Sequence, residues 1–127
     1  MKKANVTHVN NEHSYWLRSL NFYKTEISIL RGILTEIASK NTGAEAMKEV
    51  EHFENQFNIQ TDNINQLSHS IHANLSNISK QAQQSNAGYI DAALVTEHAA
   101  LNEKYENEVR VVTDVITSFR KFAGEWM

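Results

Sequence analysis

Apolar side chains recur along this chain at alternating intervals of four and three residues, in three long blocks. The first block contains Trp16, Leu20, Tyr23, Ile27, Leu30, Leu34 and Ile37. The second contains Ala46, Val50, Phe53, Phe57, Gln60, Ile64, Leu67, Ile71, Asn74 and Ile78. The third contains His98, Asn102, Tyr105, Val109, Val112, Ile116, Phe119, Ala123 and Trp126. A seven-residue repeat of this kind places one seam of side chains on each helix towards the neighbouring helices. The pattern predicts an all-α fold of three long helices.

The expected helices cover residues of about 8–39, 43–83 and 87–126, within one domain that spans residues 1–127. Short connections between long helices place consecutive helices antiparallel. We therefore expect an antiparallel three-helix bundle with coiled-coil-like packing, about 50 to 60 Å long at 1.5 Å per residue.

Short polar residues and glycine mark the two turns. The first turn follows Lys40, and there Thr42 with Glu45 three positions on resembles a capping box that starts the next helix. The second turn falls near Gly88, with Asn86 as a candidate cap for the third helix.

Two segments leave an alternative open. Thr61 and Asp62 are common helix caps, so a break near Thr61–Asn63 would give a four-helix bundle. The heptad phase passes through this segment without a slip, which favours one continuous helix. Residues 109–117 are rich in β-branched side chains, but they keep the seven-residue phase, so we also expect a helix there.

The composition narrows the range of functions. The chain has no proline and four glycines among 127 residues, which permits long helices, and it has no cysteine for disulfides or thiolate metal sites. A formal net charge of -3 without a basic face argues against a nucleic-acid partner. No apolar run is long enough for a membrane span, and the first residues do not resemble a signal peptide. We expect a cytoplasmic protein with no membrane partner.

Polar residues on the apolar seams are the candidates for chemistry. Gln60 lies in the middle of the second seam, where a polar side chain commonly fixes helix register. His13 and His98 lie on the first and third seams near one end of the bundle. In antiparallel helices, Asn74 and Asn102 are expected at nearly the same height along the bundle axis. The two histidines are expected to hydrogen-bond to each other or to asparagine.

The same end of the bundle carries a second pair of histidines, three residues apart on one helix. Imidazoles at this spacing can share zinc or another transition-metal ion such as iron, and nearby glutamates could orient them. The seam phase directs this second pair towards solvent and the first pair inward, so no cofactor is the leading expectation. The alternative is a metal-binding bundle that uses His13, His69, His72 and His98.

A second apolar row accompanies the first seam. Tyr15, Phe22 and Ile29 recur every seven residues, and further apolar residues widen the first and third helices. Exposed apolar surface of this extent commonly marks a partner site. We expect a homodimer, or a complex with another helical protein, whose interface contains Tyr15, Phe22, Ile29, Ile33, Val111, Val115 and Phe122.

No catalytic motif accompanies these features. A carboxylate-bridged two-metal centre needs two Glu-x-x-His motifs that point into the bundle. Only Glu49-x-x-His52 matches this motif, and its two residues flank the seam instead of lying on it. Neither a Ser-His-Asp arrangement nor a phosphate-binding loop is present. The sequence predicts a protein that is not an enzyme.

Three segments carry a resemblance to known proteins. Glu12-His13-x-x-Trp16, Phe22-Tyr23-Lys24-x-Glu26 and Val50-Glu51-His52-Phe53-x-Asn55-Gln56-Phe57 resemble a group of short, all-helical bacterial proteins of no assigned activity. The resemblance covers chiefly the first half of the chain and implies a small cytoplasmic bacterial protein. Together these features predict a non-enzymatic interaction or self-association module.

Overall fold

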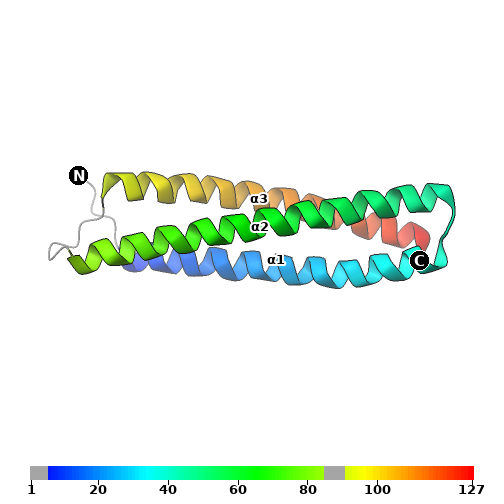
Figure 1. Cartoon of the computed structure of the whole chain (residues 1–127), viewed down its shortest axis with the longest axis horizontal. Coiled ribbons are helices and arrows are strands. Elements are labelled where there is room, and N and C mark those ends of the chain that lie inside the picture. The colour runs from blue at the N-terminus through cyan, green and yellow to red at the C-terminus, as the bar shows by residue number, and fades with distance from the viewer. Residues whose placement is uncertain (1–5, 85–90) are drawn as a thin grey trace.

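The computed structural model describes residues 6–84 and 91–127, and it contains three long helices. Helix α1 spans Val6–Lys40, α2 spans Ala44–Gln84 and α3 spans Ala92–Trp126. The helices lie side by side as a rod, with α2 antiparallel to both α1 and α3 (Figure 1). The predicted all-α three-helix bundle is confirmed.

Both ambiguous segments are helical. Helix α2 continues through Thr61–Asn63 without interruption, so the four-helix alternative is wrong. Residues 109–117 belong to α3, because their apolar side chains pack against the other helices with helical periodicity. Among the residues that the structure describes there is no strand that could pair with them.

The turn between α1 and α2 lies where the sequence predicts it, and Asn41 closes it. The Asn41 side-chain amide donates to the carbonyl oxygens of Ile37 at 2.9 Å and of Trp126 at 3.2 Å, which joins the ends of α1 and α3. The first backbone hydrogen bond of α2 runs from Met47 to Gly43. Gly43 therefore holds the N-cap position that we expected for Thr42.

Helix α3 begins later than predicted, at Ala92. The carboxylate of Asp91 accepts a hydrogen bond from the backbone N–H of Ala93 at 2.8 Å and caps the helix. The predicted cap, Asn86, lies outside the described residues.

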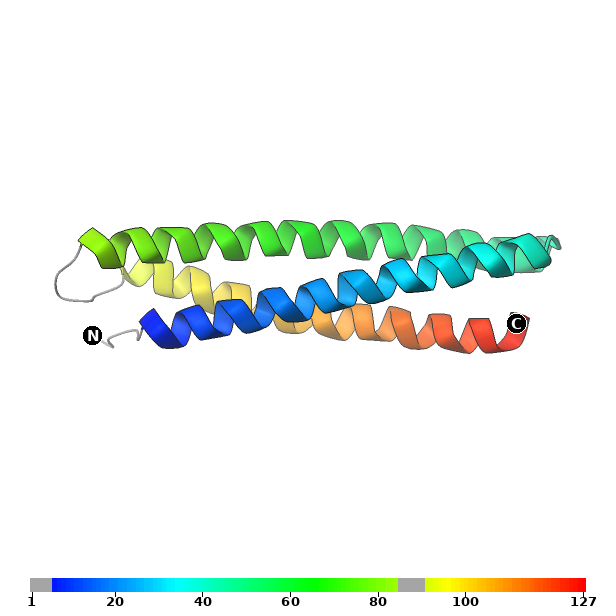
Figure 2. The same cartoon turned by 90° about the horizontal axis from the view of Figure 1, so that it is seen from below.

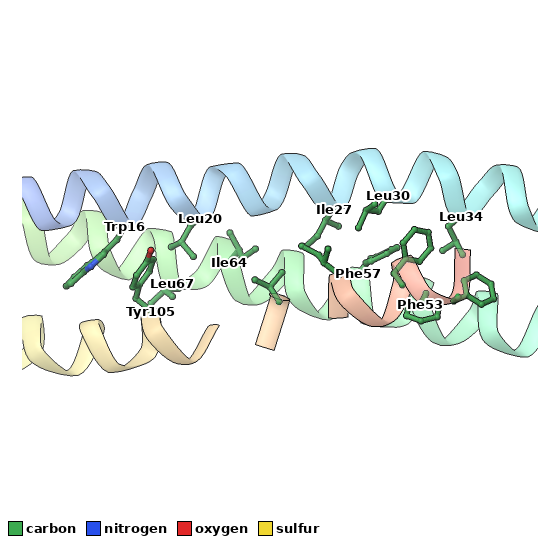
Figure 3. Close-up of a cluster of buried hydrophobic side chains, with 14 of the residues drawn as sticks. Trp16, Leu20, Ile27, Leu30, Leu34, Phe53, Phe57, Ile64, Leu67 and Tyr105 are labelled. Atoms are coloured by element: carbon green, nitrogen blue, oxygen red, sulfur yellow. The ribbon is translucent and has the colours of Figure 1, made fainter. Parts of the chain in front are cut away.

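The buried side of α2 follows the heptad prediction along its whole length. Its buried residues are Ala46, Val50, Phe53, Phe57, Gln60, Ile64, Leu67, Ile71, Asn74 and Ile78, which are the ten predicted seam positions. In α1, Trp16, Leu20 and Ile27 point into the same core, as do further seam residues towards Leu34 (Figure 3). The helices cross at shallow inclinations along the rod (Figure 2), as expected for seams with this repeat.

The third seam needs a correction. Leu101, Glu108 and Phe122 are buried on α3, whereas the predicted seam residues Asn102 and Val109 are only half-buried. A helix in a three-helix bundle faces two neighbours, so it buries a row on each side of its central row. The sequence prediction placed the row of Asn102 and Val109 in the core. The structure buries the row of Leu101, Glu108 and Phe122 more deeply.

Aromatic rings fill the core towards the α1–α2 turn. The ring of Phe53 lies 5.4 Å from that of Phe119 and 5.1 Å from that of Phe122, and Phe57 lies 5.2 Å from Phe119. The two contacts of Phe119 are edge-to-face and that of Phe53 with Phe122 is tilted, and such pairs add to the burial energy of the rings. Phe122 is thereby part of the core between α2 and α3.

Candidate functional site

A polar cluster crosses the core near the start of α1, and His13 is at its centre. This side chain is fully buried. Its Nδ1 donates to the carbonyl oxygen of Val9 at 2.7 Å, and its Nε2 lies 2.9 Å from the side-chain oxygen of Asn74. The amide nitrogen of Asn74 faces the carbonyl oxygen of Leu94 at 3.4 Å. One asparagine on α2 therefore connects α1 and α3.

The asparagine can serve either protonation state of the ring. The carbonyl of Val9 only accepts hydrogen bonds, so Nδ1 of His13 carries a proton. In a neutral ring Nε2 accepts, and the amide nitrogen of Asn74 can supply the donor. In a protonated ring Nε2 donates to the amide oxygen. Rotation of the Asn74 amide converts one arrangement into the other, and the arrangement with the nitrogen towards His13 gives up the hydrogen bond to Leu94.

His98 packs against this cluster from α3. Its ring centroid lies 4.8 Å from that of His13 and 4.9 Å from that of Trp16, on which it stacks. Its Nε2 donates to Glu12 Oε1 at 3.4 Å, and within the described chain its buried Nδ1 has no hydrogen-bond partner. Burial lowers the pKa of His98, and the adjacent His13 lowers it further. The neutral ring is favoured, because a proton on Nδ1 would have no acceptor.

Glu12 lies between two histidines at the edge of the cluster. His8, one turn earlier on α1, approaches the same Oε1 at 2.9 Å. The other two histidines of the proposed metal set, His69 and His72, are exposed on α2, as the seam phase predicts. Across residues 6–84 and 91–127, no three His, Asp or Glu side chains are grouped to hold a metal ion. The structure therefore brings together only His13 and His98 of the four candidate ligands.

A second polar group crosses the core midway along the rod. The Gln60 side chain on α2 faces the carboxyl group of Glu108 on α3, and both side chains are buried. When the amide nitrogen faces Glu108, it lies 2.9 and 2.7 Å from the two carboxylate oxygens. Burial raises the pKa of Glu108 to about 7, and a hydrogen bond from Asn63 opposes this effect. Glu108 therefore titrates near neutral pH.

A polar groove of about 270 Å³ opens beside Glu108 between α2 and α3. Amide and hydroxyl side chains line most of it, together with Lys104. Gln60 was predicted as a polar seam residue, but Glu108 was missed. The available signal was its position three residues after Tyr105 and four before Val112, on the same helix face as both.

The third feature is an exposed apolar row on α1. Tyr15, Phe22 and Ile29 have 61%, 61% and 56% of their surface exposed. The other proposed interface residues differ from these three. Ile33 and Val115 are partly buried against the core, Val111 is half-buried and Phe122 is 5% exposed. Packing against α2 thus explains why the sequence has an apolar residue at Phe122. It does not explain the exposed apolar side chains of Tyr15, Phe22 and Ile29.

A groove of about 270 Å³ runs beside the middle of this row, between α1 and α3. Phe22, Tyr23 and Glu26 line it from α1, and Ile116 and Arg120 contribute from α3. Glu26 Oε1 accepts a hydrogen bond from Arg120 at 3.0 Å across the groove.

Comparison with protein-family models, curated proteins and solved structures finds no match to this chain. Within residues 6–84 and 91–127, no helix combines the length and the apolar character needed to cross a membrane.

Proposed function

We propose that this protein is a non-enzymatic interaction module that binds a second copy of itself through the apolar row on α1. The observation that carries the proposal is the exposure of Tyr15, Phe22 and Ile29, each of which has more than half of its surface in solvent. Burial of a large apolar side chain contributes roughly 1.5 to 3 kcal/mol, so a partner that covers this row gains substantially.

The spacing of the row supports a helical partner. Residues seven apart lie on one side of a helix, and the row extends about 21 Å along α1 at 1.5 Å per residue. The large exposed apolar residues of the other helices are scattered by comparison: Met47 and Ile59 on α2 and Val95 on α3. Among the described residues, only α1 presents a row of three such residues at a regular spacing.

The buried polar groups support a structural role for the rest of the core. His13 contacts Val9 and Asn74, and Glu108 faces Gln60. These groups connect helices within one chain. In the row on α1, the ring of Tyr15 lies 6.4 Å from that of Tyr105 on α3, and this contact still leaves 61% of Tyr15 exposed.

The test is the mass of the full chain in solution, measured by sedimentation equilibrium from about 10 to 500 µM, a range that detects moderate affinities. We expect a concentration-dependent rise towards twice the chain mass of 14.5 kDa. Phe22→Ser should keep the helical circular dichroism and lower the self-affinity at least tenfold. Ile59→Ser, which changes an exposed apolar residue on α2, is the matched control and should dimerise normally. A wild-type chain that stays monomeric throughout would overturn self-association.

A further inference from the structure

We infer that the two copies pair antiparallel along α1, with a two-fold axis at Phe22. This inference rests on the proposed self-association and specifies its geometry. Tyr15 lies seven residues before Phe22 and Ile29 lies seven after it. An antiparallel pair therefore sets Tyr15 of each copy level with Ile29 of the other, and the two Phe22 side chains meet at the axis.

Charge complementarity selects this orientation. Arg18 lies four residues before Phe22 and Glu26 four residues after it, each about 40° around the helix from the row at 100° per residue. Antiparallel pairing sets Arg18 of one copy level with Glu26 of the other, twice per dimer. Parallel pairing would instead set Arg18 level with Arg18, and like charges in register are unfavourable.

Both partners of this pair are available. Arg18 is exposed and makes no ion pair within the described part of the chain. Glu26 uses Oε1 for Arg120 and keeps Oε2 for a second guanidinium group. Farther out on the same row, His8 lies fourteen residues before Phe22 and Glu36 fourteen after it, so they too are level in the antiparallel pair.

The position of Phe22 within α1 supports the same axis. Helix α1 spans Val6–Lys40, and Phe22 is one residue from its midpoint. Antiparallel pairing about Phe22 therefore overlaps the two helices along almost their whole length. Phe22 lines the groove between α1 and α3, which gives the partner's aromatic ring a place to pack.

Introduced cysteines test the orientation, because the chain contains none of its own. Tyr15→Cys and Ile29→Cys are prepared separately, mixed and oxidised under mild conditions, and the disulfide-linked species are identified by mass spectrometry. We expect the mixed 15–29 dimer to exceed each homodimer several-fold. Phe22→Cys should cross-link to itself in either orientation and reports whether a dimer forms.

The outcomes separate the orientation from the self-association. Efficient Phe22→Cys cross-linking with mainly 15–15 and 29–29 products would overturn the antiparallel pair and leave self-association in place. Monomeric wild-type protein with no cross-linking above the random level would overturn both.

A charge reversal tests the ion pair independently. Arg18→Glu should raise the dimer dissociation constant about two- to tenfold, as expected for two exposed ion pairs. Lys24→Glu makes the same charge change on the side of α1 away from the row and should leave the constant unchanged. Equal effects of the two substitutions would overturn the Arg18–Glu26 pairing.

Discussion

The side-chain amide of Gln60 and the carboxyl group of Glu108 face one another across the core, on α2 and α3. The protonation state of Glu108 decides which end of the amide meets it. An ionised carboxylate accepts from the amide nitrogen, whereas a carboxylic acid can donate to the amide oxygen. This pair therefore stays satisfied in both states, and its energy depends on pH.

Glu108→Gln should remove a pH dependence from the stability. The pKa of Glu108 is raised from 4.5 to about 7 in the folded chain, so between these values the folded state holds a proton that the unfolded state has released. The contribution of Glu108 to wild-type stability therefore falls as the pH rises from 4.5 to 7. We expect the variant to gain about 1 to 2 kcal/mol relative to wild type between pH 5 and pH 8, less than the full pKa difference implies because the groove admits solvent.

Urea denaturation followed by circular dichroism measures this gain. Glu106→Gln removes an exposed carboxylate two residues away and serves as the control. The same gain in both variants would show that general charge reduction, and not the burial of Glu108, causes the effect.

Gln60→Met should destabilise the chain at pH 8, because the Glu108 carboxylate then loses the amide donor of Gln60 and keeps only the hydrogen bond from Asn63. Loss of the partner of a buried charged group costs about 1 to 3 kcal/mol. The double variant Gln60→Met with Glu108→Met should recover most of the loss, since two apolar side chains of similar length need no hydrogen bond. The double-mutant cycle gives the coupling energy, and additive losses would contradict the pairing.

Most of the bundle could be predicted from the sequence, because each helix must bury apolar side chains at every turn of the face that meets its neighbours. Every seam position predicted on α2 is buried, Gln60 and Asn74 among them. The polar members of the seam were therefore located correctly, and so was the inward direction of His13.

The remaining errors come from three-dimensional packing that one seam does not describe. Helix α3 contacts two helices, so it buries Glu108 and Phe122 on the row that our prediction assigned to solvent or to a partner. Hydropathy disfavours a buried glutamate, and its stabilising contacts come from α2, about fifty residues away in sequence. The pairing of His13 with Asn74 likewise depends on the relative shift of two helices along their axes. The position of the connecting turn in the sequence fixes this shift only to within about one helical turn.

Acidification should loosen the end of the bundle that holds His98. Its pKa is lowered by burial and by His13, so below its usual value of 6.5 the unfolded state takes up a proton before the folded state does. This contribution leaves stability unchanged well above pH 6.5 and reduces it as the pH falls, by at most about 1.4 kcal/mol per pH unit. The pH dependence that His98 adds to the stability is opposite in sign to that of Glu108, so the two partly cancel in the wild-type protein. The contribution of His98 is therefore obtained from the difference in stability between wild type and His98→Gln.

The difference is measured by urea denaturation from pH 7.5 to 5. We expect His98→Gln to lose less stability than wild type over this range, and His69→Gln, on the exposed face of α2, to follow wild type. If His98→Gln and wild type change in parallel with pH, burial of His98 does not control the response.

Asn74→Ala should destabilise the chain at neutral pH by about 1 to 3 kcal/mol, the cost of leaving a buried polar group unpaired. The substitution removes the 2.9 Å partner of His13 Nε2 and the 3.4 Å contact with Leu94, and the fold offers His13 no substitute, because its other nitrogen is already bound to Val9. Asn77→Ala, one turn later on the exposed face, is the control for the change in helix propensity. Free energies of unfolding from urea denaturation decide the result. If the two variants are equally stable, the contacts of Asn74 add nothing to the fold. If only Asn74→Ala is weakened, its contacts with His13 and Leu94 stabilise the packing of the three helices.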